Sequence, residues 1–342
     1  MNTGFQVYLD TFYFEITNEC NFKCSFCYNS SGSSKENILF MDFNDFVHVT
    51  GILKKHGYSK FVISGGEPLL HPNIWDILEY LKEHNFHITL ITNGYLVDNE
   101  LIQFFVENKE YVLQINIDGI NQKTHDTVRC EGSYEKNINT VYSLFKSGYK
   151  NGIIRMTIMK QNYQEIQDVY DFALKHNFTP KFMFVQSKGR ANDTWEDLGL
   201  CIDEYEYVHE ALSEKIKINP NMNFVLKNLL YIGKCTLLLE SPILKPIVNV
   251  NFDVFPCTLL NNKLGNLIVD DFNQVFTGNM KYLKDKLINK HKLYVSTLCK
   301  DCICKSYCIK ECPATMADSQ KKIPICNWIE MRIKNTLFKK SK

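Results

Sequence analysis

Residues 19–28 read Glu-Cys-Asn-Phe-Lys-Cys-Ser-Phe-Cys-Tyr and follow directly on a β-rich run. They contain three cysteines, Cys20, Cys24 and Cys27. Three thiolates can hold three irons of a 4Fe-4S cluster and leave the fourth iron without a protein ligand. Such an open iron can bind a substrate or a cofactor, so this stretch predicts a catalytic iron-sulfur site. A structural zinc site is the alternative, but it needs a fourth ligand, and the next histidine, His48, lies in a predicted helix.

The composition of the whole chain limits the possible functions. The chain has 342 residues, which is enough for one large barrel or for two domains. Its 39 basic and 38 acidic side chains leave a net charge of +1, which favours neither nucleic acid nor a membrane surface as a partner. No signal peptide begins the chain and no apolar run reaches the roughly 18 residues of a membrane span, so we expect a cytoplasmic protein. Its 13 cysteines then favour metal or redox chemistry over disulfides.

From residue 12 to about residue 215, β-rich apolar runs alternate with amphipathic stretches, which is typical of repeated βα units and a parallel sheet. The predicted strands lie at 12–17, 60–64, 87–92, 111–117, 152–159 and 181–186. The predicted helices lie at 42–56, 73–83, 99–106, 134–147, 163–176, 203–218 and near 272–289, with a polar loop at 187–200. The sequence therefore predicts an α/β fold, with a partial (β/α)6 TIM-like barrel at 1–220. A bridging segment at 221–234 and a small cysteine-rich domain at 235–342 follow.

Polar and glycine-rich motifs follow these strands at their carboxyl ends, where ligands collect in such folds. Gly65, Gly66 and Glu67 follow the second strand; glycines allow close approach of a backbone, and a carboxylate can pair with an ammonium group. Asn116 ends the fourth strand, and Arg129 lies beyond it, where its guanidinium can pair bidentately with a carboxylate. A surface salt bridge is the alternative for Arg129. Thr92-Asn93-Gly94 and Asp118-Gly119 follow the third and fourth strands at the same edge, and their convergence with Gly65-Gly66-Glu67 and the cysteines predicts one active site.

The cysteine triad and the glycine-rich motif resemble those of the radical S-adenosylmethionine (SAM) superfamily, which carries Cys-x3-Cys-x2-Cys and Gly-Gly-Glu-Pro motifs. The resemblance implies that the open iron chelates the amino and carboxylate groups of the methionine moiety of SAM. It also implies that Gly65, Gly66 and Glu67 bind that amino group, and that Phe26 contacts the adenine. Asn116 stands where the family usually has serine, and the resemblance makes Arg129 a partner for the carboxylate of SAM.

The C-terminal cysteines resemble the SPASM domain of the peptide-modifying branch of that superfamily. The resemblance implies an auxiliary 4Fe-4S cluster held by Cys299, Cys302, Cys308 and Cys326, and a second held by Cys235, Cys257 and Cys312. The gap between Cys235 and Cys257 is longer than usual in the family, so we expect one or two auxiliary clusters. A zinc-ribbon-like module is the alternative, because Cys-x2-Cys pairs are common zinc ligands.

The resemblance implies an enzyme that cleaves SAM reductively to a 5′-deoxyadenosyl radical, which abstracts a hydrogen atom from a peptide or protein. The expected substrate is a ribosomally synthesised precursor peptide, modified by a crosslink or by epimerisation. The expected partners are a flavodoxin- or ferredoxin-type reductant and, if a leader peptide is bound, a separate leader-peptide-binding protein. A first strand near residue 12 leaves no room for a leader-binding domain before it. The sequence does not single out a catalytic base.

Two other functions fit part of this pattern. An anaerobic sulfatase-maturating type of enzyme, which generates formylglycine, resembles this chain in architecture, but such enzymes typically carry an aspartate where this chain has Thr258. A non-catalytic iron-sulfur or zinc module that binds a partner needs neither an open iron nor the Gly65-Gly66-Glu67 motif. Formation of 5′-deoxyadenosine from added SAM distinguishes an enzyme from such a binding module.

Overall fold

Six parallel strands form the centre of the molecule and run in sequence order across the sheet. The computed structural model describes residues 6–32, 37–222, 225, 237 and 242–297. The six strands are β2 (Phe12–Glu15), β3 (Lys60–Ser64), β4 (His87–Thr92), β5 (Val112–Asn116), β6 (Gly152–Ile158) and β7 (Thr179–Phe184). Each pairs in parallel with the next. They confirm the predicted α/β fold and partial barrel, and each strand end lies within two residues of its predicted position.

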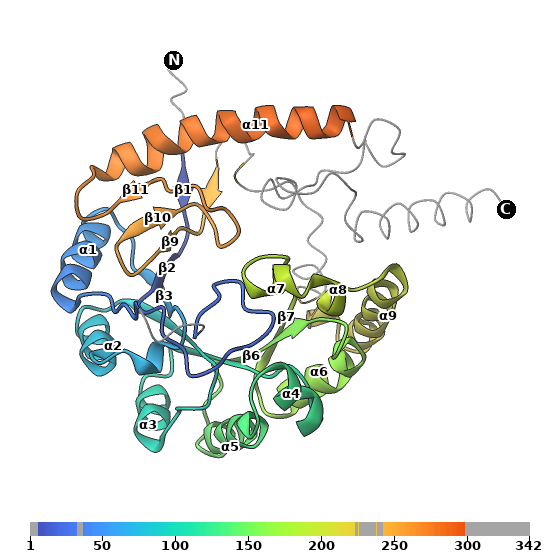
Figure 1. Ribbon diagram of the computed structural model, residues 1–342. Helices are drawn as coiled ribbons and strands as arrows, with labels where there is room; N and C mark the ends of the chain where they lie inside the picture. Colours follow the sequence, from blue (N-terminus) through green and yellow to red (C-terminus); the bar gives the residue numbers. More distant parts are fainter. Residues whose placement is uncertain (1–5, 33–36, 223–224, 226–236, 238–241, 298–342) are drawn as a thin grey trace.

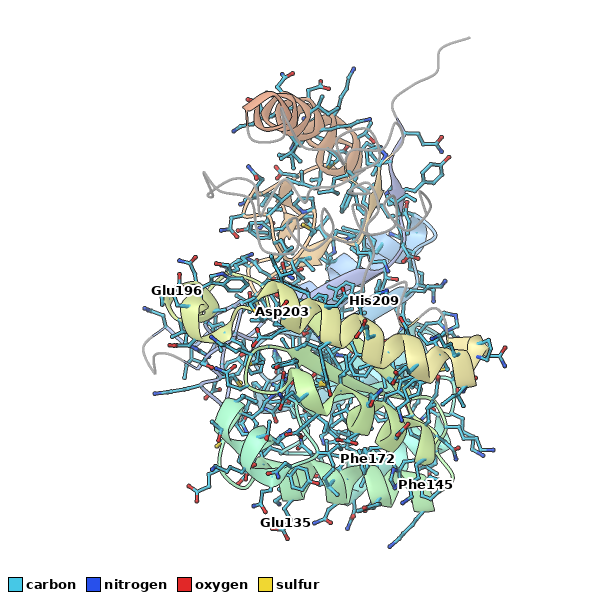
Figure 2. All side chains as sticks on the ribbon, turned by 90° about the vertical axis from the view of Figure 1, so that its right-hand side faces the viewer. Glu135, Phe145, Phe172, Glu196, Asp203 and His209 are labelled. Carbon is cyan, nitrogen blue, oxygen red and sulfur yellow. The ribbon has the colours of Figure 1, made fainter. Side chains whose placement is uncertain are left out.

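Helices cover one face of this sheet, because each connection between parallel strands crosses back along the same side. They are α1 (Phe43–Lys55), α2 (Ile74–Glu83), α3 (Asn99–Glu107), α4 (Gln122–Val128), α5 (Ser133–Lys146), α6 (Ile166–Lys175) and α9 (Ile202–Ile218), with short 3₁₀ turns at Pro68–Leu70, Tyr163–Glu165 and Pro220–Met222. Figure 1 shows helices around the outside of the curved sheet. Figure 2 shows α9 crossing the molecule, with Asp203 and His209 along it. We call the face that the helices cover the outer face and the opposite one the inner face.

Short-range signals in the sequence begin and end these helices. Asp42 and Asp98 precede α1 and α3, and their side chains accept hydrogen bonds from backbone N–H groups of the first turn. Four helices end just before a residue with positive φ, namely Gly57, Asn85, Gly148 and Asn177. An aromatic residue follows each of them, and its N–H donates to a carbonyl five residues earlier. These caps stop each helix and turn the chain back toward the next strand.

The two faces of the sheet differ in polarity because successive side chains of a strand point to opposite sides. In β6, Ile154, Met156 and Ile158 lie on the outer face and are fully buried. Arg155 and Thr157 lie on the inner face and are partly exposed. Further inner-face side chains are Tyr13, Glu15, Gln114, Asn116, Lys181 and Met183. The outer face packs with the helices in one apolar core, and the polar side chains gather on the inner face.

The chain after residue 242 continues the same sheet. Its strands are β8 (Ile243–Leu244), β9 (Ile247–Val248), β10 (Asp253–Phe255) and β11 (Gly265–Asn266). β9 pairs in parallel with β2, and β10 and β11 extend the sheet in antiparallel order. β8 pairs with β1 (Tyr8–Leu9) as a separate two-stranded sheet. A π-helical turn (Gln274–Asn279) leads into α11 (Met280–Thr297), the long helix at the top of Figure 1.

The structure tests one of two predictions about the organisation of the chain. The bridging segment predicted at 221–234 falls largely outside the described residues, so the domain division stays a prediction. The predicted loop at 187–200 is wrong in part, because it contains α7 (Arg190–Asp193) and α8 (Trp195–Leu198). Each is a single turn, too short to show a helical period among turn-forming residues. No helix in the described ranges is long and apolar enough to cross a membrane.

Candidate active site

The loop that follows β2 carries the three predicted cluster ligands, Cys20, Cys24 and Cys27. Cys24 is buried and the other two thiols are half-buried. The N–H of Cys27 donates to the carbonyl of Cys24 at 3.2 Å, which holds these two residues in a tight turn. The apolar side chains packed with the loop are Phe22, Phe26, Val128, Met159 and Val185. Figure 1 shows the loop, in dark blue, inside the curve of the sheet. The three thiols share one apolar cluster.

Burial makes two of these thiols, Cys20 and Cys24, weaker acids. It raises the pKa of Cys20 to about 12, and the neighbouring Glu67, Cys24 and Cys27 add to the rise. Burial also raises the pKa of Cys24, although the charge of Arg129 opposes this. Among the described residues, no three His, Cys, Asp or Glu side chains surround a single metal-ion position. A 4Fe-4S cluster takes each thiolate on its own iron, and its positive charge favours the thiolate form, so these donors fit a cluster.

The two glycines at the end of β3 hold the backbone of the cysteine loop. The N–H of Gly66 donates to the carbonyl of Thr17, and the N–H of Glu67 donates to that of Glu19, both at 2.7 Å. A Cβ on Gly65 would lie 2.3 Å from the Thr17 oxygen, and one on Gly66 would lie 1.9 Å from the Glu19 oxygen. Gly65 also has a φ of 135°, which side chains disfavour. Only glycine therefore permits this approach, as the sequence predicted in general terms.

The carboxylate of Glu67 is fully buried at the same edge of the sheet. Its oxygens accept hydrogen bonds from the hydroxyl of Thr92 and the N–H of Asn93, both at 2.7 Å, and from the N–H of Leu69 at 3.2 Å. Burial raises the pKa of Glu67 to about 7, although these hydrogen bonds oppose the rise. The side chain of Asn93 in turn donates to Asn21 at 2.7 Å. β3, β4 and the cysteine loop are thus joined through one buried carboxylate.

Arg129 lies against the cysteine loop in a buried ion pair with Asp118. Its side chain is 9% exposed and that of Asp118 is fully buried, so the alternative of a surface salt bridge is wrong. The guanidinium also reaches Cys24, with Nη1 3.9 Å from Sγ, and its central carbon lies 4.9 Å from the ring centroid of Phe26. Asp118 accepts a further hydrogen bond from the N–H of Thr157 at 2.6 Å. The structure therefore brings Phe26, Arg129 and Cys24 together.

Asn116 lies beside this group, on the inner face at the end of β5. Its Nδ2 donates to the carbonyl of Thr92 at 3.2 Å, and its Oδ1 is buried without a hydrogen-bond partner. His125, within α4, accepts a hydrogen bond from the N–H of Asp118 at 3.1 Å. Burial lowers the pKa of His125 to about 4, so it is a neutral acceptor that helps to position Asp118.

The sequence prediction missed Arg190, which fixes the far side of the cysteine loop. Its Nε donates to the carbonyl of Cys24 at 2.8 Å, and its Nη1 donates to that of Ser31 at 2.7 Å. Its own N–H donates to the carbonyl of Cys27 at 3.1 Å. The only signal was a Gly-Arg pair in the polar segment 187–200, which has no recognisable motif.

One predicted auxiliary-cluster ligand, Cys257, is described, and it lies near the barrel. Lys188, which follows β7, donates from Nζ to the carbonyl of Thr258 at 2.5 Å. Lys188 also interacts electrostatically with Cys257 and with Glu15 at the end of β2. Cys257 is therefore close to the carboxyl edge of the sheet. The remaining predicted ligands lie outside the described residues, namely Cys235, Cys299, Cys302, Cys308, Cys312 and Cys326.

This arrangement, three thiols and a glycine-rich strand end inside a six-stranded partial barrel, defines the class of the protein. Residues 14–173 match the model of the radical SAM superfamily, so the chain contains a radical SAM domain. The match confirms the predicted membership of that superfamily. It also confirms the predicted cofactors, SAM and a 4Fe-4S cluster.

Several named proteins are similar to this chain. The chain is 24% identical over 201 residues to mycofactocin maturase MftC of Mycolicibacterium smegmatis, covering 59% of this chain and 51% of the relative. It is 26% identical over 276 residues to the antilisterial bacteriocin subtilosin biosynthesis protein AlbA of Bacillus subtilis, covering 78% and 59%. Streptococcus suis SuiB bound to precursor peptide SuiA has the same fold, with a TM-score of 0.65 at 15% identity over 81% of this chain and 67% of that chain. The chain thus spans about half the length of the mycofactocin maturases that it matches.

Proposed function

We propose that this protein is a radical SAM enzyme of the peptide-modifying branch, which matures a ribosomally synthesised precursor peptide. One observation carries the proposal: the three thiols, the buried Glu67 and the Phe26–Arg129 contact meet at one edge of the sheet, inside a radical SAM domain. The names of MftC, AlbA and the SuiB complex with its precursor peptide support the substrate class. The modification itself is a crosslink or an epimerisation.

Different residues of this chain have different roles at the site. Cys20, Cys24 and Cys27 hold the catalytic cluster. When bound, the cluster and SAM together supply a 5′-deoxyadenosyl radical by reductive cleavage of SAM. Arg129 places a fixed positive charge beside Cys24, which favours the thiolate. The apolar packing around the loop excludes water, which protects a reactive radical.

The same geometry supports the proposed contacts to SAM. Gly65 and Gly66 bring the backbone of β3 against the cysteine loop, and Glu67 offers a buried carboxylate that can pair with the amino group of SAM. Phe26 presents a ring for the adenine. Asn116 has a buried oxygen without a partner at this edge. Asn116 and Arg129 are our candidates for recognition of the methionine moiety.

The second half of the chain has a supporting role in this proposal. The contact between Lys188 and Thr258 keeps Cys257 close to the carboxyl edge of the sheet, which supports an auxiliary cluster there that would accept the electron left after bond formation. We propose the cysteine assignments made from the sequence for one or two such clusters. A flavodoxin- or ferredoxin-type reductant supplies the electron for SAM cleavage, and a separate protein binds the leader peptide.

The test is anaerobic reconstitution with iron and sulfide, followed by reduction in the presence of SAM. We expect wild-type protein to form 5′-deoxyadenosine and Cys24→Ala to form none, because a cluster with two thiolates is not retained. Cys201→Ala, which removes an exposed thiol outside the loop, is the matched control and keeps the activity. Changing all of Cys20, Cys24 and Cys27 to Ala should lower the iron content from about 12 to about 8 with two auxiliary clusters, or from about 8 to about 4 with one. Wild-type protein with full iron occupancy that forms no 5′-deoxyadenosine would contradict the proposal.

A further inference from the structure

The inner face carries two cations at neighbouring positions. Arg155 on β6 and Lys181 on β7 are directly paired in the parallel register, and Asn116 on β5 pairs with Arg155 on its other side. Side chains opposite each other on adjacent strands lie close together, and like charges in that position destabilise the sheet. Arg155 and Lys181 therefore repel each other inside the curve of the sheet.

Among the described residues, no carboxylate forms an ion pair with either cation. The phenols of Tyr28 and Tyr13 and the carboxylate of Asp118 act on Arg155, but the carboxylate is already paired with Arg129. Glu15, on the same face, accepts its hydrogen bonds from Tyr28 at 3.0 Å and Asn29 at 2.8 Å. The charge of this pair thus lacks a counter-charge in the described part of the protein.

Gln114 adds an unpaired hydrogen-bond donor to the two cations, next to Asn116, whose Oδ1 is a buried acceptor without a partner. Its Oε1 accepts from Nζ of Lys181 at 3.1 Å, which fixes the orientation of the amide. Its Nε2 is then buried without an acceptor, and Nε of Arg155 is buried without one as well. Buried polar groups are rarely left unpaired, because desolvation without a hydrogen bond costs about 1–3 kcal/mol. Two unpaired donors beside two positive charges define a site for an anion with several acceptor oxygens.

Solvent reaches this part of the inner face. Met183, two residues beyond Lys181 on the same face of β7, is 38% exposed. Arg155 and Lys181 are themselves only partly buried, whereas Ile154 and Phe182 on the outer face are buried. The pair is therefore accessible to a ligand from the inner face.

We propose that Arg155, Lys181 and Gln114 form a binding site for a carboxylate of the substrate peptide, from an Asp or Glu side chain or from its C-terminus. The inference rests on the proposed function, because a peptide substrate offers these carboxylates as its anions. The methionine carboxylate of SAM is the other source of the same chemistry. We assign the site to the peptide because Asn116 and Arg129, next to the cysteine loop, are the candidates for SAM, and Lys181 lies on the last strand beyond them.

The experiment uses the anaerobically reconstituted full chain with saturating SAM, so that the carboxylate of SAM is already placed. The probes are N-acetyl-L-glutamate α-methylamide and its neutral glutamine counterpart, titrated at constant ionic strength while the unfolding temperature is measured. A ligand that binds the folded state raises that temperature in a dose-dependent way. We expect the glutamate probe to bind at least about tenfold more tightly than the glutamine probe, as charge-assisted hydrogen bonds imply.

Three variants test whether the preference for the glutamate probe depends on Lys181. Lys181→Met should weaken binding of the glutamate probe at least about tenfold, Lys181→Arg should retain it, and Lys150→Met, an exposed control before β6, should leave it unchanged. Equal binding of both probes to wild-type protein overturns the proposal without any variant. A preference for glutamate that disappears when SAM is added also overturns it, because the pair then holds SAM. 5′-Deoxyadenosine measured on the same samples reports separately on the proposed function, so either inference can fail alone.

Discussion

The inner and outer faces of the same sheet show how one set of strands serves two purposes. On the outer face, Ile63, Leu90, Ile115 and Ile154 are fully buried against the helices. On the inner face of β5 and β6, Gln114, Asn116 and Arg155 have buried polar atoms without a hydrogen-bond partner. The outer face supplies stability through apolar burial, and the inner face accepts unpaired polar groups that cost stability but can bind ligands. The predictions below test how strictly this division holds.

The largest expected loss of stability comes from the edge of the sheet where ligands bind, not from the apolar outer face. Gly66→Ala places a Cβ 1.9 Å from the Glu19 carbonyl oxygen, which is backbone and cannot move without displacing the cysteine loop. We expect a loss of at least about 3 kcal/mol in the free energy of unfolding, together with loss of the catalytic cluster. Urea denaturation and iron analysis measure the two effects.

Gly51→Ala is the matched control for that variant. Gly51 lies within α1 with nothing within 4 Å of the added Cβ, so alanine should stabilise the helix by about 0.5–1 kcal/mol. If Gly66→Ala is as stable as wild type and retains iron, the close approach of β3 to the loop is not what holds the site together.

Neighbouring residues of β6 compare the faces directly. Ile154, on the outer face, is fully buried, whereas Ile153, on the inner face, is partly exposed. Ile154→Ala should cost about 2–5 kcal/mol, because it removes buried methyl groups and leaves a cavity, and Ile153→Ala should cost about 1 kcal/mol. Similar losses in urea denaturation for the two variants would mean that the inner face is as tightly packed as the outer one.

The smallest expected effect is a gain in stability and not a loss. Burial, with the charges of Arg155 and Lys245, lowers the pKa of Lys181 from 10.5 to about 8, and Gln114 is its hydrogen-bond partner. Below about pH 8 the folded protein bears the full penalty of this charge, and the penalty fades as pH rises toward 10.5, where the unfolded chain also loses the proton. Lys181→Met should therefore stabilise the ligand-free protein by about 1 kcal/mol near pH 7, and by less near pH 10. A variant that is less stable than wild type near pH 7 would show that the bond to Gln114 outweighs the repulsion.

Much of the barrel could be predicted because its signals are local. The strands from Phe12 to Phe184 are short apolar runs between helices with their own caps, and the cysteine and glycine motifs occur at strand ends. A further local signal was available but not used. A Gly or Asn followed by an aromatic residue ends four helices, at Gly57, Asn85, Gly148 and Asn177.

The features that escaped prediction depend on contacts between distant segments. β9 has two residues and no period of its own, and its place beside β2 is fixed only by tertiary pairing. Arg190 becomes part of the site because the chain after β7 folds back onto Cys24 and Cys27. Arg155 and Lys181 carried one readable signal, a charge at an alternating position of an otherwise apolar strand. Their pairing with each other required the register of β6 and β7.

The pairing of β2 with β9 has a consequence for synthesis of the protein. Phe14 of β2 meets its partner Val248 across 234 residues of chain. At about 5–20 residues per second, the ribosome needs roughly 10 to 50 s to make that stretch. During this time the strand that leads into the cysteine loop has one open edge, which exposes unpaired backbone groups to other nascent chains. Whether the cluster is inserted before or after β9 arrives therefore determines how long the cysteine loop, the most reactive segment of the chain, stays unprotected during translation.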